Sequence, residues 1–373
     1  MFDGGKGITD LKPALENIFG EALVGKSEFL QTFSTESQCV RNVISNGAVL
    51  QCYVLKEGPN VSDTNSDASG SSAEYQVVRM GLHSLPVGLL YSRMVALTFL
   101  LIDGSSPIDV SDPQWDIYFS VKKIQKLGDY DVRILGFATV YRFYHHPDST
   151  RLRLSQILVL PPYQGQGHGR CLLESVNSVA VAEGVYDLTI EEPSEYLQYL
   201  RSCIDTLRLL DFEPIKPAVT SVASLLKTGS VAKKASKSLA VPPTYTAEIT
   251  RQKLKINKKQ FFRCWDILLY ISLDPMNCIV MQNFRSCIST RIKSDILDKD
   301  PETNGKHLIE VENNYDHDMT FVVYYCSQVE NESDTGKVIR GVSAQEEQLN
   351  QLVDKQMDEI REIAKKVSLL RSS

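Results

Sequence analysis

The chain has 373 residues and a formal net charge of −6, with 43% hydrophobic and 23% charged side chains. That length allows two or three domains, and that composition is ordinary for a soluble globular protein. The negative charge argues against direct binding of nucleic acid and would suit a basic substrate, although mild acidity also keeps proteins soluble.

Cysteine usage and hydropathy predict an intracellular protein in a reducing compartment. The eight cysteines include no Cys-x-x-Cys pair and the six histidines show no metal-ligand spacing, so we expect neither a disulfide framework nor a metal site. The most apolar run, residues 82–102, is interrupted by Pro86, Gly88 and Arg93, and the first residues lack the apolar core of a signal peptide. We therefore expect no membrane segment.

The first hundred residues predict two helices, a strand and a flexible loop. Residues 9–33 carry apolar side chains at helical spacing, and residues 42–54 alternate as in a strand or short hairpin. Residues 58–74 hold too little apolar surface to order themselves, so a flexible loop is expected there. Helical spacing returns over residues 89–102.

Strand and helix patterns alternate from residue 115 to residue 210. Strands are predicted over 115–122, 134–143, 152–160 and 185–190, and helices over 167–182 and 194–210. The strand over 152–160 is apolar at nearly consecutive positions, which is typical of a central strand, and Pro161 and Pro162 end it because proline cannot continue a ladder. The order of elements predicts a mixed α/β domain.

The last third of the chain is predicted to be a linker followed by helices. Residues 213–245 contain four prolines and a basic piece at 233–237, which is either a solvated linker or a localisation signal. Helices are predicted over 252–273, 277–297 and 344–370, and the polar stretch before the last one holds an apolar run at 321–325. The last helix carries an apolar stripe that either packs in a core or meets a partner helix, and packing is the simpler explanation. The stripe consists of Leu349, Val353, Met357, Ile360, Ile363, Val367 and Leu370.

Residues 20–27 fit the pattern Gly-x-x-x-x-Gly-Lys-Ser, but their surroundings argue against a nucleotide site. A P-loop must follow a strand and open a helix, because its backbone N–H groups and the helix N-terminus hold the phosphates. The residues before Gly20 have a helical pattern, and the loop interior consists of helix formers. Asp103 could stand for the magnesium-binding aspartate, but it follows a predicted helix and not a strand.

The glycine-rich loop at residues 164–169 is the strongest functional motif. Its sequence, Gln-Gly-Gln-Gly-His-Gly, follows a buried strand and opens an amphipathic helix. N–H groups at a helix N-terminus, with glycines that allow close approach of the backbone, form a site for pyrophosphate. The spacing does not fit the Gly-x-Gly-x-x-Gly fingerprint of dinucleotide-binding folds. A turn that merely links strand to helix would not need three glycines, and the spacing Gln-x-x-Gly-x-Gly resembles the signature of the GNAT acetyltransferases.

Two carboxylates, Glu191 and Glu192, follow the next strand, at the sheet edge where ligands bind beside a parallel neighbour. Acyl transfer to a lysine needs a base, because an amine with a pKa of about 10.4 is a cation that cannot attack. Adjacent carboxylates in a partly buried cleft would raise each other's proton affinity, as such a base requires. The pattern alone is equally consistent with acids that stabilise a helix N-terminus.

From about residue 89 to residue 210 the chain resembles the catalytic subunits of the type B histone acetyltransferases. The matched segments are most similar to those of the plant members. The stretches that carry the resemblance are Ile108-Asp109-Val110, residues 153–160, 163–169 and 191–194, and more weakly residues 254–260. It implies an α/β fold with a mixed sheet, with a GNAT acetyl-CoA-binding catalytic domain at residues 86–212. A partial α/β substrate-side domain is expected at residues 1–85, a linker at 213–245 and a helical C-terminal domain at 246–373. Family members carry a longer acidic N-terminal region, so we expect this sequence to be shortened there.

The resemblance also implies a reaction and its residues. It predicts direct transfer of acetyl from acetyl-CoA to lysines in the N-terminal tail of newly synthesised histone H4. Glu191 would be the general base and Glu192 would support it, while Asp103 falls where the family usually has a glutamate proposed as an additional base. The strand before the loop would pair with the pantetheine arm and the loop would hold the pyrophosphate. The implied cofactor-binding residues are Ile157, Leu158, Val159, Gln164, Gly165, Gln166, Gly167, His168, Gly169 and Arg170, and the implied contacts to the histone tail are Tyr141, Arg142 and Phe143.

The implied partners are the histone H4 tail and a WD-repeat histone-binding subunit, in the cytoplasm and the nucleus. Two other functions remain open from the sequence. One is a GNAT protein that acetylates another amine or binds CoA without catalysis, and the other is a P-loop nucleotide-binding protein.

Overall fold

The computed structural model describes residues 23–54, 74–126, 129–227, 241–297 and 335–372, with a few single positions before residue 23. The chain divides into two compact units, residues 1–198 together with 251–257, and residues 199–250 together with 258–373. In the part of the chain that is described, no helix has the length and apolar character needed to cross a bilayer.

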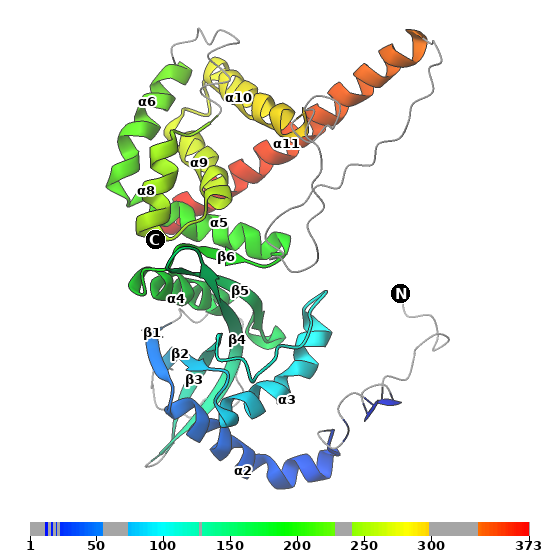
Figure 1. The fold of residues 1–373 in the computed structure, drawn as a ribbon, viewed down its shortest axis with the longest axis vertical. Coiled ribbons are helices and arrows are strands. Elements are labelled where there is room, and N and C mark those ends of the chain that lie inside the picture. The colour runs from blue at the N-terminus through cyan, green and yellow to red at the C-terminus, as the bar shows by residue number, and fades with distance from the viewer. Residues whose placement is uncertain are drawn as a thin grey trace. The chain divides into compact units, whose positions relative to one another are not determined.

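The first unit is built on a six-stranded sheet (Figure 1). Its strands are β1 (Ala48–Tyr53), β2 (Glu74–Gly81), β3 (Trp115–Lys126), β4 (Asp129–His145), β5 (Ser149–Val159) and β6 (Leu188–Ile190). Its helices are α2 (Lys26–Ser45), α3 (Leu85–Leu101) and α4 (His168–Ala182), with a short 3₁₀ turn η2 (Pro161–Tyr163). The strands lie in sequence order, and each pair is antiparallel except β5 and β6, which run parallel. The sheet is therefore mixed, which confirms the predicted α/β class.

Helices cover both faces of this sheet (Figure 1). On one face α2 and α3 pack with inward-facing residues of the strands, among them Ile117, Phe119 and Phe137. On the other face α4 packs against β3, β4 and β5 through the buried side chains of Leu172 and Val176. Because α4 also joins β5 to its parallel neighbour β6, its N-terminus lies just after the end of β5, where the 164–169 loop was predicted.

The second unit is helical. The chain enters it along α5 (Glu195–Leu210), and its other elements are η3 (Glu213–Ile215), α6 (Lys216–Lys227), α8 (Thr244–Leu254), α9 (Lys258–Ser272), α10 (Cys278–Leu297) and α11 (Thr335–Ser372). The apolar stripe of α11 is buried at Val353, Met357, Ile360, Ile363 and Val367, and α11 packs on α9 and α10. Core packing therefore explains the stripe, as predicted.

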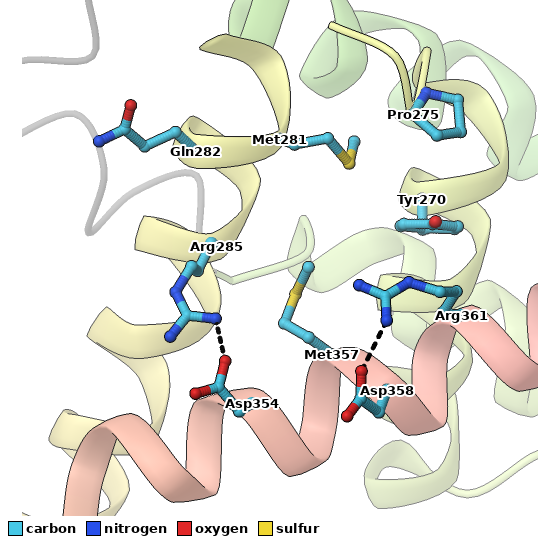
Figure 2. A pocket seen from close by; sticks show the side chains of 9 residues that line it. All are labelled: Tyr270, Pro275, Met281, Gln282, Arg285, Asp354, Met357, Asp358 and Arg361. Carbon is cyan, nitrogen blue, oxygen red and sulfur yellow. Dashed lines mark hydrogen bonds and ion pairs between the residues drawn. The ribbon is translucent and has the colours of Figure 1, made fainter. Parts of the chain in front are cut away.

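A pocket of about 590 Å³ lies between α9, α10 and α11 in this helical unit. Figure 2 shows methionine side chains in it and two ion pairs beside them, Arg285 with Asp354 and Arg361 with Asp358. Its lining residues are Tyr270, Pro275, Met281, Gln282, Arg285, Asp354, Met357, Asp358 and Arg361. None of the side chains predicted to take part in function lines it, since all of them belong to the first unit.

The predicted separate domain over residues 1–85 is not found in the described part of that range. Strands β1 and β2 complete the same sheet as β3 to β6, and α2 packs against β4. The predicted strand over residues 42–54 also begins late, because α2 continues to Ser45. Val43 and Ile44 have strand-forming side chains, but they are buried against the sheet from a helix, so tertiary packing overrides local preference.

The predicted linker over residues 213–245 is wrong for residues 213–227. Helix α6 buries Ala218, Val219, Val222, Ala223 and Leu226 in the helical unit. Pro214 and Pro217 do not prevent helix formation here. They stand in the first turns of η3 and α6, where proline removes no helical hydrogen bond. The structure also divides the chain after Gln198 and not after residue 212.

The predicted continuous helix over residues 252–273 is interrupted between Leu254 and Lys258. Lys255 has a left-handed backbone with φ of 60°, and Ile256 forms a parallel bridge to Leu188. The Leu188 N–H donates to the Lys255 carbonyl at 2.9 Å, so this segment covers the outer edge of β6. Satisfying the edge of a buried strand outweighs the continuation of the helix.

Some of the remaining predicted segments can be compared with the structure, and others lie outside the described residues. Residues 89–101 are helical in α3, as expected, so Asp103 does follow a helix and not a strand. Residues 26 and 27 are the first residues of α2, while most of the residues before Gly20 lie outside the described part. The predicted flexible loop lies outside it too, except for Glu74, which begins β2, and so do the basic piece at 233–237 and the apolar run at 321–325.

The burial of α11 predicts how its substitutions affect stability. Ile360→Ala should lower the free energy of unfolding by about 2–5 kcal/mol, because it leaves a cavity at a side chain that is 4% exposed. Leu352→Ala, in the same helix but 48% exposed, should change it by less than about 0.5 kcal/mol. Urea denaturation, monitored by circular dichroism, measures both free energies. Equal effects would show that Ile360 is not on the buried face of α11.

Candidate active site

The site lies where β5 and β6 part. The two strands pair only from Leu152 to Leu154 of β5, because β6 ends at Ile190 while β5 continues to Val159. In the β4–β5 pair, Val140 lies opposite Leu154 and Thr139 opposite Gln156, so Ser155 is an extra residue in β5. Such a β-bulge redirects the strand that follows it.

The bulge turns backbone groups of β5 toward the open side. After it, Gln156 N–H donates to Thr139 Oγ1 at 3.1 Å and Leu160 N–H donates to the Leu135 carbonyl at 2.8 Å, both toward β4. Because residues of a strand alternate, the N–H groups of Ile157 and Val159 point the other way, where β6 has ended. Leu158 does not share this orientation, since its backbone faces β4 and its side chain is buried in the core. Of the three predicted strand contacts, the structure thus places two at an open edge.

The buried side chain of Gln156 holds the bulge in place through hydrogen bonds. Its side chain is 4% exposed, accepts a hydrogen bond from Tyr91 Oη at 2.9 Å, and donates to the Ser106 carbonyl at 2.9 Å and to Ser105 Oγ at 3.2 Å. These bonds tie β5 to the loop after α3 that carries Asp103, whose own side chain is exposed. Sequence reasoning missed this role, although a glutamine inside an otherwise apolar strand is a usable signal.

The predicted carboxylates lie at the end of β6. Glu191 N–H donates to the Leu154 carbonyl at 2.9 Å, and its Oε2 accepts a hydrogen bond from Ser155 Oγ at 2.5 Å. Glu192 has a left-handed backbone with φ of 33°, a conformation that costs a residue with a side chain about 1–2 kcal/mol. Both side chains are exposed, so the expected partly buried cleft is wrong for the described structure. The reason is that β6 is short and ends at the edge of the sheet.

The glycine loop has the geometry of an anion cradle. Gly165 and Gly167 have φ of 75° and 104°, and Gly167 is the N-cap of α4. Gln164 Nε2 donates to the Val159 carbonyl at 2.8 Å and Gln166 Nε2 donates to the Pro162 carbonyl at 3.1 Å, so both amides hold the loop itself. This leaves the backbone N–H groups around the exposed Gly165 and the half-buried Gly167, together with the N-terminus of α4, as the donors for a pyrophosphate. The residues present therefore fit a phosphate-bearing co-substrate.

Arg170 and Gly169 complete the predicted cradle on the first turn of α4. The Arg170 guanidinium is half-exposed and pairs with Glu174 one turn further along at 2.7 Å. An exposed pair of this kind contributes little stability, so a phosphate could compete for the arginine. Gly169 adds another backbone N–H at the helix N-terminus.

The side chain of His168 lies on the inside of the loop. It is 1% exposed, and its Nδ1 is 2.9 Å from Tyr53 Oη, which in turn is 2.8 Å from Ser120 Oγ. Burial, together with the positive charge of Lys122, lowers the pKa of His168 from 6.5 to about 4. Among the predicted cradle residues, His168 can therefore offer only its backbone to a ligand. Sequence reasoning had no signal for Tyr53 or Ser120, because they come from separate strands.

The predicted substrate residues are divided between the two faces of β4. Tyr141 donates to Asp112 Oδ2 at 2.9 Å, and its ring meets that of Phe143 at 4.5 Å. Arg142, on the opposite face, is engaged by Asp116 and by Glu183 at the end of α4. Neighbouring residues of a strand point to opposite faces, so the three cannot act as one contact.

An aromatic row crosses the sheet toward Glu191 on the face of Tyr141. The register aligns Trp115 with Tyr141, Tyr141 with Arg153, and Arg153 with Thr189, and Glu191 follows two residues later. The rings of Trp115 and Tyr141 lie 4.8 Å apart, and the Arg153 guanidinium lies 4.2 Å from the centre of the Phe143 ring. Over the described ranges, no group of three or more His, Cys, Asp or Glu side chains is placed to hold a metal ion.

Comparisons with known proteins identify the family of this region. Residues 108–197 match the acetyltransferase (GNAT) family, a range that contains the bulge, the glycine loop and both carboxylates. Over 368 residues the chain is 46% identical to the histone acetyltransferase type B catalytic subunit of Zea mays. The aligned region covers 98% of this chain and 76% of that protein. It is 45% identical over 367 residues to the histone acetyltransferase type B catalytic subunit of Arabidopsis thaliana, with coverages of 98% and 77%. These relatives confirm the predicted resemblance, including its plant character.

Solved structures also match part of the chain. One is the crystal structure of an aminoglycoside acetyltransferase from an uncultured soil metagenomic sample in complex with sisomicin. It is 17% identical, covers 33% of this chain and 81% of that chain, and has a TM-score of 0.25.

The anchor at Gln156 predicts a stability loss. Gln156→Leu should lower the free energy of unfolding by about 1–3 kcal/mol, because it leaves the Tyr91 hydroxyl and the Ser106 carbonyl without their partner. The matched control Gln125→Leu, at an exposed position of β3, should change it by less than about 0.5 kcal/mol. Urea denaturation compares the two variants, and an equally small effect at Gln156 would contradict the anchoring role.

The lowered pKa of His168 predicts a pH dependence of stability. The unfolded chain takes up this proton near pH 6.5 while the folded protein resists it until about pH 4, so the contribution of the neutral imidazole is complete above about pH 6.5 and is lost as the pH falls toward 4. His168→Asn removes the titration. The difference in unfolding free energy between wild type and variant should therefore be smaller at about pH 4.5 than at about pH 7.5. A difference that is constant with pH would contradict the assignment.

Proposed function

This chain belongs to the family of type B histone acetyltransferase catalytic subunits, and we propose that it acetylates lysines in the N-terminal tail of newly synthesised histone H4. As a GNAT acetyltransferase it uses acetyl-CoA as its co-substrate. The observation that carries the proposal is the position of Glu191. Its carboxylate is held by Ser155 at the point where β5 and β6 part, next to the strand edge of Ile157 and Val159.

The open edge of β5 and the glycine loop would bind different parts of acetyl-CoA. The N–H groups of Ile157 and Val159 face the open side of β5 and can pair with the amides of an extended pantetheine arm, as another strand would. The backbone N–H groups from Gly165 to Arg170 would hold the pyrophosphate at the N-terminus of α4. Acetyl-CoA supplies the activated acetyl thioester. An N–H group at the edge of β5 is also a donor that can polarise the thioester carbonyl.

Glu191 is proposed as the general base. A lysine ammonium must lose a proton before its nitrogen can attack, and a carboxylate beside the acceptor amine can take it. The bond from Ser155 Oγ fixes the orientation of the Glu191 carboxylate, and the N–H bond to Leu154 fixes its backbone. Glu192, in its strained backbone conformation, would support the same site. Asp103 is a further candidate base, since Gln156 ties its loop to the bulge.

A basic tail fits the face that leads to Glu191. The Tyr141 and Phe143 rings offer flat apolar surface to lysine side chains, and Asp112 next to Tyr141 adds a negative charge. The exposed Asp109 and the half-buried Asp112, in a chain of net charge −6, favour the approach of a basic peptide. Arg142 is repelled by such a tail and is already paired with acids of its own, so we propose Tyr141 and Phe143 without it.

The family resemblance also supports a WD-repeat histone-binding subunit as partner and the cytoplasm and nucleus as locations. Co-purification of that subunit with the tagged chain from cell extract tests the first, and cell fractionation tests the second.

The proposal predicts a separation of chemistry from binding at Glu191. Glu191→Gln should slow acetylation of a histone H4 tail peptide by about 10²–10⁴, because the amide cannot accept the proton. Its Kd for acetyl-CoA, measured by isothermal titration, should stay within about twofold of wild type, since the carboxylate does not hold the phosphates. Mass spectrometry of the peptide gives the rate. Glu362→Gln, at an exposed position of α11, is the matched control and should change neither quantity.

The same assay separates the rival functions. An unchanged rate in Glu191→Gln would reject the base assignment. Binding of acetyl-CoA without any acetyl mass shift on the H4 peptide would reject the substrate. Binding of ATP without acetyl-CoA would reject the whole assignment.

A further inference from the structure

A buried chain of polar side chains lies directly beneath the glycine loop. It runs from Ser120 on β3 through Tyr53 on β1 to the imidazole of His168, the first residue of α4, with spacings of 2.8 and 2.9 Å. Ser120 and His168 are almost completely buried and Tyr53 is half-buried. Because the side chains of Ser120 and His168 are buried, they are not presented to a ligand in solvent, so their role differs from that of the cradle itself.

Three tyrosine rings surround the imidazole, and one of them, Tyr163, lies at the start of the loop. The ring centres of Tyr75, Tyr53 and Tyr163 lie 5.2, 5.9 and 6.5 Å from that of His168. Tyr163 belongs to η2, immediately before Gln164, and His168 follows directly after the N-cap Gly167. The residues at which the loop begins and ends therefore pack on each other, while Tyr53 and Tyr75 connect them to the sheet.

We propose that His168, held by Tyr53 and Ser120, is a positioning residue that fixes the loop and the N-terminus of α4 for binding of the acetyl-CoA pyrophosphate. The inference rests on the proposed assignment of residues 164–170 as the phosphate cradle. The physical reason is that donors held in place before binding lose less freedom when the ligand arrives. Loosening the first residue of α4 would move the N–H groups on which the cradle depends.

The imidazole does this without carrying charge. Burial and the neighbouring Lys122 on β3 lower its pKa to about 4, so it is neutral near pH 7. Its Nε2 is buried and has no hydrogen-bond partner among the described residues, which also disfavours a second N–H on the ring. A charged histidine would attract the pyrophosphate directly, whereas this one can affect binding only through the position of the backbone.

Two small substitutions on separate strands test the proposal. Tyr53→Phe and Ser120→Ala each break the chain of hydrogen bonds and leave the packing nearly unchanged. Each should raise the Kd and the KM for acetyl-CoA about three- to tenfold, the net contribution of one or two hydrogen bonds, and change kcat at saturation by less than about twofold. His168→Asn keeps a polar group near Nδ1 and should have a smaller effect than His168→Leu. Tyr245→Phe, at a tyrosine that is 59% exposed in the helical unit, is the control and should bind as wild type does.

Isothermal titration with acetyl-CoA gives the Kd, steady-state acetylation gives KM and kcat, and thermal unfolding shows that each variant is folded. An unchanged Kd in folded Tyr53→Phe and Ser120→Ala would overturn the proposal. So would a fall in kcat at unchanged Kd, which would place the effect on the chemistry.

A loop variant separates this inference from the assignment on which it rests. Gly167→Val places a branched side chain at a φ of 104° and should abolish measurable acetyl-CoA binding if the loop is the cradle. Unchanged binding in Gly167→Val would reject the cradle. Lost binding there together with an unchanged Kd in Tyr53→Phe would reject only the positioning role of His168.

Discussion

The arrangement of the site depends on one extra residue in β5. Ser155 makes a bulge against β4, and beyond it the N–H groups of Ile157 and Val159 point away from β4. Because β6 has already ended at Ile190, no strand among the described residues pairs with that side of β5. The strand edge offered to acetyl-CoA, the carboxylate at the end of β6 and the N-terminus of α4 are neighbours for this reason.

Buried polar side chains hold this opening from both faces of the sheet. On the face of α3, Gln156 binds Tyr91 and the loop after the helix. On the face of α4, His168 binds Tyr53 beneath the glycine loop. Unpaired polar groups are costly inside a protein, so each of these bonds favours one position of the backbone over its alternatives. The exposed groups of the site are thus positioned by hydrogen bonds of buried and partly buried side chains.

Elements with a strong local pattern were predictable, and elements decided by distant contacts were not. The strand at 152–160, the helix after the glycine loop and the stripe of α11 follow from periodicity that neighbouring residues carry among themselves. Residues 42–45 and 255–257 were predicted wrongly because a sheet from elsewhere in the chain decides them. Pro214 and Pro217 suggest a linker by composition, although the first turn of a helix accepts proline.

By itself, the sequence determined the chemistry of the loop and the order of the site along the chain. Glycines at 165 and 167 permit the left-handed backbone, and their place between strand and helix makes an anion site, because these are local properties. Only the tertiary structure decided which side chains face the site. It turned Arg142 toward Asp116, placed His168 inside the loop, and joined Glu191 to Ser155. A shift of one residue in a strand exchanges its two faces, so these choices depend on the register and the bulge, which no local pattern encodes.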